Sequence, residues 1–360
     1  MAEQSVADPD VAGSDVEPTS VFLRACRGLS VDRTPVWLLR QAGRYQPAYR
    51  AIREKHSMLE VIRTPELAAQ VTLLPIDSFG LDAAIVFSDI LPPLVGMGLD
   101  LDFVKGDGPR IGNPISTRRD VDMLGTPPAE ETMTGTLEAI RIVRRELEAR
   151  DVPVIGFAGA PFTLASYAIE GGTSKDFMKT KAFMLSEPAA WKRLLGKLVT
   201  VQADYLLAQA AAGAQALQVF DSWVGRALGR EDYLRYVAPH NRDLFAKVAA
   251  ADVPVINFSL GVSAYLSEAA GCGDVVGLDW SLPLDEAWKR VGFDRPVQGN
   301  LDPASLLAPW RELRFRIDDV LDRAGGRPGH VFNVGHGLTP QTPEDNVRRL
   351  VEHVRERTSA

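Results

Sequence analysis

Short runs of apolar and β-branched residues recur along the chain, and each run ends in polar or glycine residues. Eight such runs follow one another, and continuous apolar runs of this length are typical of strands buried in a parallel sheet. They are PVWLLR (35–40), DAAIVFSD (82–89), PVIGFAG (153–159), ALQVFDS (216–222), PVINFS (254–259), VVGLDW (275–280), PVQGNLDP (296–303) and HVFNVGHG (330–337).

The stretches between these runs repeat their apolar positions with the period of a helix. Helices are predicted over 64–78, 187–211, 230–250, 284–291, 303–323 and 343–357. The first begins with favourable residues, because Thr64 suits an N-cap and Pro65 suits the first helical position.

Strands and helices that alternate eight times predict an α/β fold, a (β/α)8 TIM barrel in which residues 20–360 form a single domain. Such barrels span ~250 residues before insertions. The longest predicted insertion is 91–136, which is rich in Gly, Pro and Asp and reads as a loop or hairpin above the second strand. A doubly wound open sheet is the alternative, although no GxGxxG sequence follows the first strand.

Composition narrows the class of protein further. The 360 residues are 46% hydrophobic, which is enough for a large buried core. Residues 1–19 have neither a basic start nor an apolar run, so we expect a disordered acidic tail and a cytoplasmic protein without a membrane span. A net charge of −7 argues against nucleic acid as a partner. Cys26 and Cys272 stand far apart, so neither a disulfide framework nor a metal site is predicted.

The strand ends carry the candidate chemistry, because barrel active sites lie where the carboxyl ends of the strands meet. Several of these polar residues are expected to serve the scaffold instead. The candidates are Arg40, Asp89, Phe220, Asp221, Ser222, Ser259, Asp279, Asn300 and His336.

Arg40 and Arg44 form the strongest feature, with Gly43 between them and aromatic residues around them. A guanidinium presents a planar fork that matches a carboxylate and stays charged at any physiological pH, so the pair predicts an acidic ligand. Two solvated loop arginines are the alternative, which the apolar run before Arg40 disfavours.

Five motifs, in this order, resemble the uroporphyrinogen decarboxylase family. They are PVWLLRQAGRY (35–45), FSDIL (87–91), GAPFTLASYAIEGG (159–172), VFDSW (219–223) and NVGHG (333–337), and the likeness runs from about Val21 to the C-terminus. The resemblance implies a cofactor-free (β/α)8 barrel, usually a homodimer, that removes the four acetate carboxyls of uroporphyrinogen to give coproporphyrinogen. That substrate has eight carboxylates around a macrocycle and four pyrrole N–H donors at its centre.

The resemblance also implies roles for individual residues. Arg40 and Arg44 match substrate-binding arginines, and Asp89 matches a central aspartate that accepts pyrrole N–H bonds and stabilises a pyrrole cation. Taken alone, Asp89 is equally well a turn former or helix cap. His336 is expected either to act as an acid or to bind a propionate, so the proton donor is left open between it and Arg40.

Further positions complete the expected site. Tyr167 and Ser222 match positions that orient an acetate group through their hydroxyls. Phe220 is expected to supply an apolar wall, although a strand-end Phe is usually core. The backbone amides of Gln41, Ala42 and Gly43 are expected to approach a carboxylate, and 169–174 (IEGGTS) is a candidate lid.

Three alternatives remain open. A zinc-dependent methyltransferase of the same barrel superfamily would need His and Cys ligands that this sequence does not group together. Phosphosugar chemistry would use the loops after the seventh and eighth strands but leaves Arg40, Arg44 and Asp89 without a role. A noncatalytic tetrapyrrole carrier would need the arginines but not the central anion.

Overall fold

The computed structural model describes residues 19–104 and 108–359. Its centre is a parallel sheet in which the strands follow the order of the chain, β1-β4-β5-β6-β7-β8-β9. This order never reverses, so the doubly wound alternative is wrong. The strands are β1 (Ala84–Ile85), β4 (Val154–Gly159), β5 (Ala216–Asp221), β6 (Val255–Ser259), β7 (Val275–Gly277), β8 (Val297–Gln298) and β9 (His330–Val331).

Residues 35–37 lie between the two edges of this sheet and close it into the predicted barrel. Val36 pairs in parallel with Phe332, next to β9, and the Phe332 N–H donates to the Pro35 carbonyl at 2.9 Å. On the other side, the Asp82 N–H donates to the Val36 carbonyl at 2.8 Å. The first predicted strand is thus reduced to one bridge residue, because the Leu39 N–H donates to the Asn333 side chain rather than to a neighbouring backbone.

The seam between the start and end of the barrel is held by a buried carboxylate. Asp82 accepts two hydrogen bonds from Arg33, at 2.6 and 2.7 Å, and one from Arg355 at 3.0 Å. It also accepts the Val36 N–H at 2.8 Å. One side chain therefore joins the first strand segment, the second strand and the C-terminal helix.

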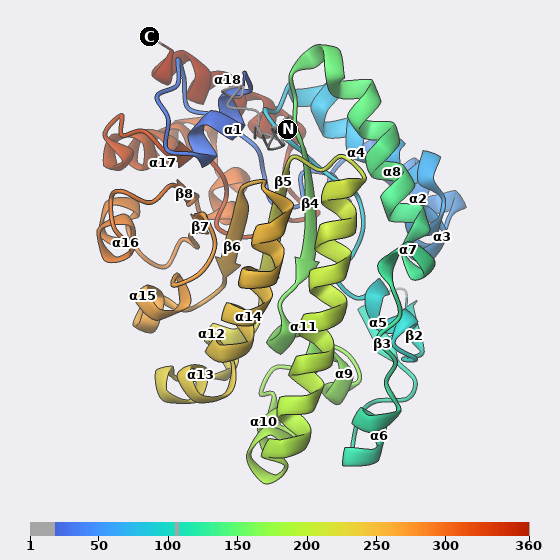
Figure 1. The fold of residues 1–360 in the computed structure, drawn as a ribbon. Coiled ribbons are helices and arrows are strands. Elements are labelled where there is room, and N and C mark those ends of the chain that lie inside the picture. Colours follow the sequence, from blue (N-terminus) through green and yellow to red (C-terminus); the bar gives the residue numbers. More distant parts are fainter. Residues whose placement is uncertain (1–18, 105–107, 360) are drawn as a thin grey trace, which may run out of the picture.

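Helices surround the sheet (Figure 1). They are α1 (Val21–Cys26), α2 (Pro47–Lys55), α3 (Met58–Arg63), α4 (Pro65–Phe79), α5 (Pro92–Gly96), α6 (Arg118–Met123), α7 (Ala129–Thr132), α8 (Thr134–Leu147), α9 (Pro161–Glu170), α10 (Met178–Ser186), α11 (Pro188–Ala211), α12 (Val224–Ala227), α13 (Arg230–Tyr236), α14 (Ala238–Val248), α15 (Leu266–Ala269), α16 (Leu284–Val291), α17 (Trp310–Ala324) and α18 (Glu344–Thr358), with 3-10 turns at η1 (Glu148–Arg150), η2 (Ala249–Ala251), η3 (Ser263–Tyr265) and η4 (Pro303–Leu307).

Two predicted helices are each split in the structure. The helix expected over 230–250 divides into α13 and α14 near Pro239, and the one over 303–323 divides into η4 and α17 at Pro309. Proline lacks an N–H and clashes with the carbonyl four residues back, so it favours the start of a helix and disfavours its interior, although α4 accommodates Pro75. Thr64 lies at the N-cap of α4 as predicted, but its side chain forms no capping hydrogen bond.

The predicted insertion contains the expected hairpin. β2 (Leu101–Val104) pairs antiparallel with β3 (Gly108–Ile111), and α5, α6 and α7 flank it. The predicted last three strands are too long, because β7, β8 and β9 end at Gly277, Gln298 and Val331. Beyond these ends Leu301 and Val334 form one more parallel bridge, and the residues after it belong to the loops above the barrel.

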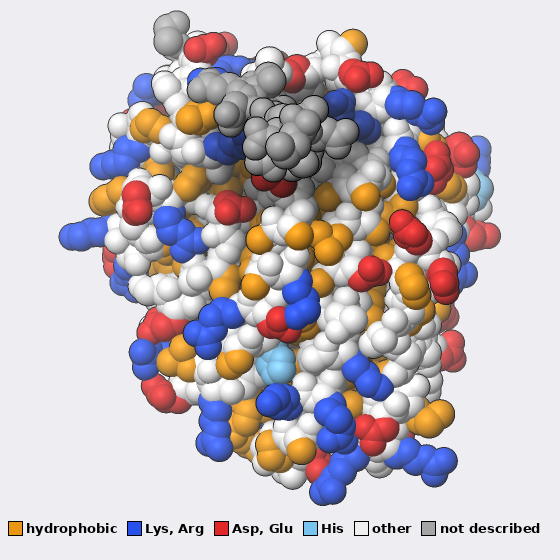
Figure 2. Space-filling model, in the orientation of Figure 1, with side chains coloured by type: hydrophobic (Ala, Val, Ile, Leu, Met, Phe, Trp, Pro, Cys, Tyr) orange, Lys and Arg blue, Asp and Glu red, His pale blue; other side chains and the backbone are white. Residues whose placement is uncertain are grey.

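The two ends of the barrel carry different parts of the chain. Its strands point toward the end where α9, α10, α12 and α13 lie, whereas α1 and α18 lie at the opposite end (Figure 1). Basic and acidic side chains are interspersed over the face formed by α11 and α14 (Figure 2). None of the helices in the described ranges is long and apolar enough to cross a membrane. The tail expected to be disordered lies outside the described residues, except Thr19, whose hydroxyl donates to Asp151.

Candidate active site at the carboxyl ends of the strands

Arg40 follows the segment that closes the barrel and adopts a left-handed backbone conformation with φ of 56°. A residue with a side chain occupies this region at a cost of order 1–3 kcal/mol, and such residues cluster at functional sites. The aliphatic part of Arg40 lies on Gly337, where a β-carbon would come within 2.7 Å of Arg40 Cγ. Arg40 is exposed, and it forms no ion pair with any residue that the structure describes.

Asp89 follows β1 and is half-buried. Its Oδ1 accepts the Leu91 N–H at 2.9 Å, and the Ile90 N–H also bonds to the carboxylate. Asp89 is therefore a turn former, as the sequence left open, but α5 has Leu91 and not Asp89 at its N-cap. Burial raises the pKa of Asp89, and the two amides and the positive charge of Arg40 offset part of this rise. Since a carboxylate has about four lone-pair sites, further N–H donors can still be accepted.

Tyr167 is carried by α9 and faces the same region. Its ring stacks on Trp223 with 3.7 Å between centroids, and Phe177 meets Trp223 edge-on at 5.1 Å. Burial raises the pKa of Tyr167 above its ordinary value, and the negative charge of Asp89 raises it further. The hydroxyl therefore stays protonated at physiological pH and is available as a hydrogen-bond donor.

Phe220 and Ser222 lie at the end of β5, and both are half-buried. Phe220 meets Phe157 edge-on at 5.6 Å and Phe258 at 5.9 Å between ring centroids. Phe220 thus packs with the core through these two rings, and its use as an apolar wall for the substrate stays a prediction.

His336 lies in the loop after β9 and is half-buried. Burial lowers the pKa of His336, and the positive charges of Arg40 and Arg226 lower it further. The ring is therefore neutral at physiological pH, with one N–H donor and one acceptor nitrogen. The exposed Trp280 ring lies 6.2 Å away and meets it edge-on.

Two cations that were not among the sequence-based candidates, Arg53 and Arg226, also lie near the site. On α2, Tyr49 has a pKa that burial raises and that Arg53, Arg44 and Arg40 lower, so all three guanidiniums lie around one phenol. Arg53 is four residues after Tyr49, which places both on one face of α2. That spacing was the available signal for Arg53, whereas the position of Arg226 on α12 depends on tertiary structure.

The backbone amides at 41–43 are partly engaged within the protein. The Gln41 N–H donates to the Leu38 carbonyl at 2.9 Å, and the Gly43 N–H donates to the Gln46 side chain at 3.4 Å. The Gln41 side chain is buried and donates to the Ala83 carbonyl at 3.2 Å. Gln41 therefore serves the scaffold, and the approach of these backbone amides to a carboxylate stays a prediction.

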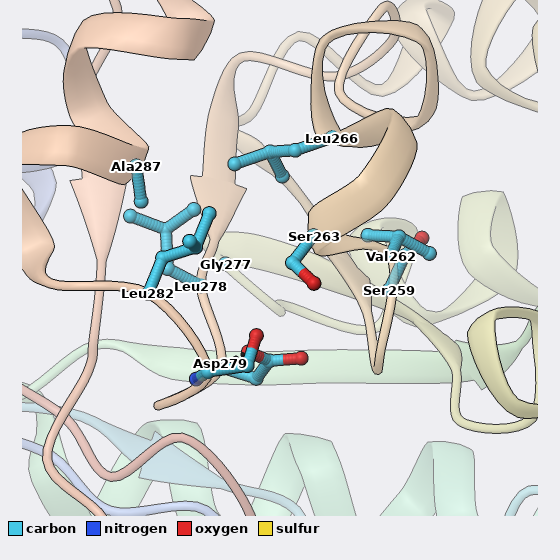
Figure 3. Close-up of a pocket in the computed structure, with 10 residues that line it drawn as sticks. Ser259, Val262, Ser263, Leu266, Gly277, Leu278, Asp279, Leu282 and Ala287 are labelled. Carbon is cyan, nitrogen blue, oxygen red and sulfur yellow. Dashed lines mark hydrogen bonds between the residues drawn. The ribbon is translucent and has the colours of Figure 1, made fainter.

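Other strand-end candidates also hold loops together. Asp279 accepts the Gly261 N–H at 2.6 Å and the Ser281 N–H at 2.8 Å, while Asn300 donates to the Asp279 carbonyl at 2.9 Å. Ser259 and Asp279 line a small cavity between β6 and β7 (Figure 3). Its volume of about 10 Å³ has room for one water molecule at most, so it is no organic ligand site.

The predicted lid, 169–174, begins at the end of α9 and is anchored on both sides. Gly172 pairs with Arg110 of β3, and the Glu170 carboxylate accepts the N–H and the hydroxyl of Thr180, each at 2.9 Å. Phe177, just beyond the segment, is buried. Closure of this segment stays a prediction. Over the described ranges, no three His, Cys, Asp or Glu side chains gather in a group that could hold a metal ion.

A family model and the curated relatives of this chain point to the same family. The model described as uroporphyrinogen decarboxylase (URO-D) matches residues 17–357. The uroporphyrinogen decarboxylase of Roseiflexus sp. is 54% identical over 343 residues, covering 94% of this chain and 98% of that protein. That of Thermus thermophilus is 52% identical over 337 residues and covers 93% and 97%.

Solved structures support the fold. A methyltransferase from Methanosarcina mazei superimposes with a TM-score of 0.79 over 93% of this chain and 97% of its own, at 20% identity. A B12-independent methionine synthase from Shewanella sp. reaches 0.54 at 11% identity, with coverage of 91% and 96%. Identities this low show a shared barrel and leave the chemistry to the site.

Proposed function

Since this chain belongs to the uroporphyrinogen decarboxylase family, which makes it a decarboxylase of tetrapyrrole biosynthesis, we propose that Asp89, Arg40 and Arg44 carry its reaction. The substrate is uroporphyrinogen III, and each of its four acetate side chains becomes a methyl group, which gives coproporphyrinogen III and carbon dioxide. The observation that supports this assignment best is the half-buried carboxylate of Asp89, with the charge of Arg40 and the hydroxyl of Tyr167 nearby.

The reaction needs a site for positive charge. Protonation of a pyrrole α-carbon forms an iminium-like cation, which accepts the electron pair of the carbon–carbon bond as carbon dioxide leaves. A second proton, delivered to the new methylene group, gives the methyl group, and the α-proton returns to the medium. Each acetate therefore consumes one proton overall.

Ionised Asp89 stabilises that cation while its free lone pairs accept pyrrole N–H bonds. At ~4 Å and an effective dielectric constant of ~20, two unit charges interact by ~4 kcal/mol. If that interaction exists only in the transition state, it accelerates the reaction roughly a thousandfold. The turn formed by the Leu91 and Ile90 amides fixes the carboxylate before substrate binds.

The guanidiniums bind the rim of the macrocycle. Arg40, Arg44 and Arg53 all lie near Tyr49, so several substrate carboxylates can pair with guanidinium groups there. His336 is neutral and suits a hydrogen bond from its N–H to a propionate better than proton donation. Phe220 offers an apolar surface to the pyrrole rings, and Tyr167 and Ser222 offer hydroxyls to an acetate.

Anaerobic incubation of metal-free protein with uroporphyrinogen III tests the proposal, with carboxyl loss followed by chromatography of the oxidised porphyrins. Stepwise conversion from eight to four carboxyls is expected, and D89A should lose turnover far more than substrate binding. If folded D89A decarboxylates at a near-normal rate, Asp89 is not the stabilising anion. Substrate binding without conversion by the wild type would favour a tetrapyrrole carrier, and zinc bound by folded protein that does not convert the substrate would favour a methyltransferase.

We further propose that the enzyme works as a homodimer in the cytoplasm. The support is the resemblance of its five motifs to the family, whose members are usually homodimers. Light scattering at several protein concentrations should give twice the mass of one 39.3 kDa chain. A monomer at assay concentration with full activity would contradict the dimer.

A further inference from the structure

Asp221 is a buried carboxylate that the proposed reaction does not use. It ends β5, is 1% exposed, and points to the opposite side of the strand from Phe220. Burial raises the pKa of Asp221 to about 6. A carboxyl group in such a place is costly unless it is well hydrogen-bonded, so its partners indicate what it holds together.

Three different helices supply those partners. The Thr163 hydroxyl of α9 donates to Oδ1 at 2.8 Å, and the Asn241 side chain of α14 donates to Oδ2 at 3.4 Å. The Val224 N–H, at the start of α12, also bonds to the carboxylate. Tyr233 and Tyr265 are the titratable side chains that face it from α13 and η3, and both stay protonated because burial raises their pKa.

The same contacts lead back to the active site. Thr163 Oγ1 accepts the Trp223 N–H at 3.3 Å, and the Trp223 ring stacks on Tyr167. Thr163 and Tyr167 are four residues apart, so they share one face of α9. Ser222 lies between Asp221 and Trp223 in the chain. The carboxylate and the Thr163 hydroxyl thus fix the helix that carries Tyr167 to the turn that carries Ser222.

We propose that Asp221 and Thr163 are positioning residues, which hold the hydroxyls of Tyr167 and Ser222 at the distance needed to orient one acetate group of the substrate. This inference rests on the roles proposed above for Tyr167 and Ser222. Neither Asp221 nor Thr163 touches the substrate, and their effect passes through the Trp223 stack and the end of β5.

The alternative is that the same contacts only stabilise the fold. The two cases differ in kinetics, because a misplaced orienting group reduces catalysis out of proportion to binding. The experiment therefore removes the hydroxyl link with T163V, which keeps the side-chain shape, and restores it with T163S. Double variants T163V/Y167F and T163V/S222A show whether the effect passes through the two site hydroxyls.

T163V should lower kcat about ten- to a hundredfold with KM changed by less than about twofold, and T163S should recover most of the rate. In at least one of the two double variants, T163V should add little to the loss already caused by Y167F or S222A. A normal kcat in T163V overturns the inference, and so does a loss that multiplies fully in both backgrounds.

Thermal melting of each variant separates folding from kinetics. If T163V does not fold, D221N takes its place, since an amide keeps the carboxyl shape and removes the charge. Full activity in both Y167F and S222A would overturn their proposed roles and this inference with them. Impaired Y167F or S222A alongside a fully active T163V would overturn only the positioning role.

Discussion

The side chain of Arg40 lies on the backbone of Gly337. The loop after the last strand therefore supports the arginine that follows the first strand segment. A β-carbon at position 337 would come within 2.7 Å of Arg40 Cγ, which is closer than real β-carbons approach other atoms. G337A should therefore displace the guanidinium. We expect KM for uroporphyrinogen to rise about tenfold or more, which corresponds to a loss of one charge-assisted hydrogen bond.

The matched control is G196A, because a β-carbon at Gly196 on α11 meets no atom within 4 Å. That variant should keep wild-type kinetics and gain slightly in stability, since alanine favours a helix over glycine. If G337A and G196A have the same KM, the support of Arg40 by Gly337 has no functional value.

Replacement of Asp89 by asparagine should lower the activity and raise the stability of the protein. Burial raises the folded-state pKa of Asp89 above its unfolded value, so the proton stabilises the folded protein. That stabilisation is fully present below the unfolded pKa of ~3.9 and is lost as pH rises through the folded value. D89N should lose roughly a thousandfold in kcat, yet melt at a higher temperature than the wild type at pH 8.

The melting-temperature gain of D89N should shrink as the pH falls toward 4. Wild-type kcat should also fall on acidification at a higher pH than an ordinary aspartate would give. A melting difference that is the same at pH 4 and pH 8 would show that the charge of Asp89 is not what destabilises the fold.

Arg40 combines a proposed substrate-binding side chain with an unfavourable backbone conformation. At φ of 56°, glycine costs less than alanine by roughly 1–2 kcal/mol. R40G and R40A should both weaken substrate capture, but R40G should unfold at a higher urea concentration. Equal midpoints for the two variants would argue against backbone strain at this position.

The Asp82 carboxylate should contribute strongly to stability. D82A leaves the guanidiniums of Arg33 and Arg355 and the Val36 N–H without their shared acceptor. Loss of one partner from a buried ionic group typically costs 3–5 kcal/mol, so we expect a change of about that size in the free energy of unfolding.

The control for D82A is D77A, whose exposed pair with Arg150 should contribute about 0–1 kcal/mol. Urea titration of both variants measures the difference. Similar unfolding free energies for the two would show that the seam does not depend on this carboxylate.

Much of the fold was predictable because strands buried on both faces appear as continuous apolar runs. The same apolar pattern made the predicted strands near the site longer than the observed ones. The apolar pattern continues past β7 and β9, where the pairing is reduced to single contacts. The Leu278 N–H still donates to the Gln298 carbonyl, and Val334 still pairs with Leu301, but the residues that follow lie in loops. Where a strand ends depends on side-chain hydrogen bonds such as that from Leu39 N–H to Asn333, which no local pattern reveals.

The site was predictable only in part for a similar reason. Motifs at strand ends indicated Arg40, Asp89 and His336, and barrel geometry does bring these residues near one another, while their roles stay predictions. Arg226 was missed because its position at the site depends on how α12 packs above the sheet. Asp279 and Asn300 were strand-end candidates on the same grounds, and only their hydrogen bonds show that they hold loops.

The position of Arg40 also depends on the pairing of Val36 with Phe332. Arg40 follows closely after residues 35–37, and the backbone of this segment pairs with Phe332, far along the chain, so a chain that stops before Phe332 lacks one of the two neighbours that hold the segment. A truncated product that stops before Phe332 would leave the first arginine without its support, and it could not compete with the full-length enzyme for substrate.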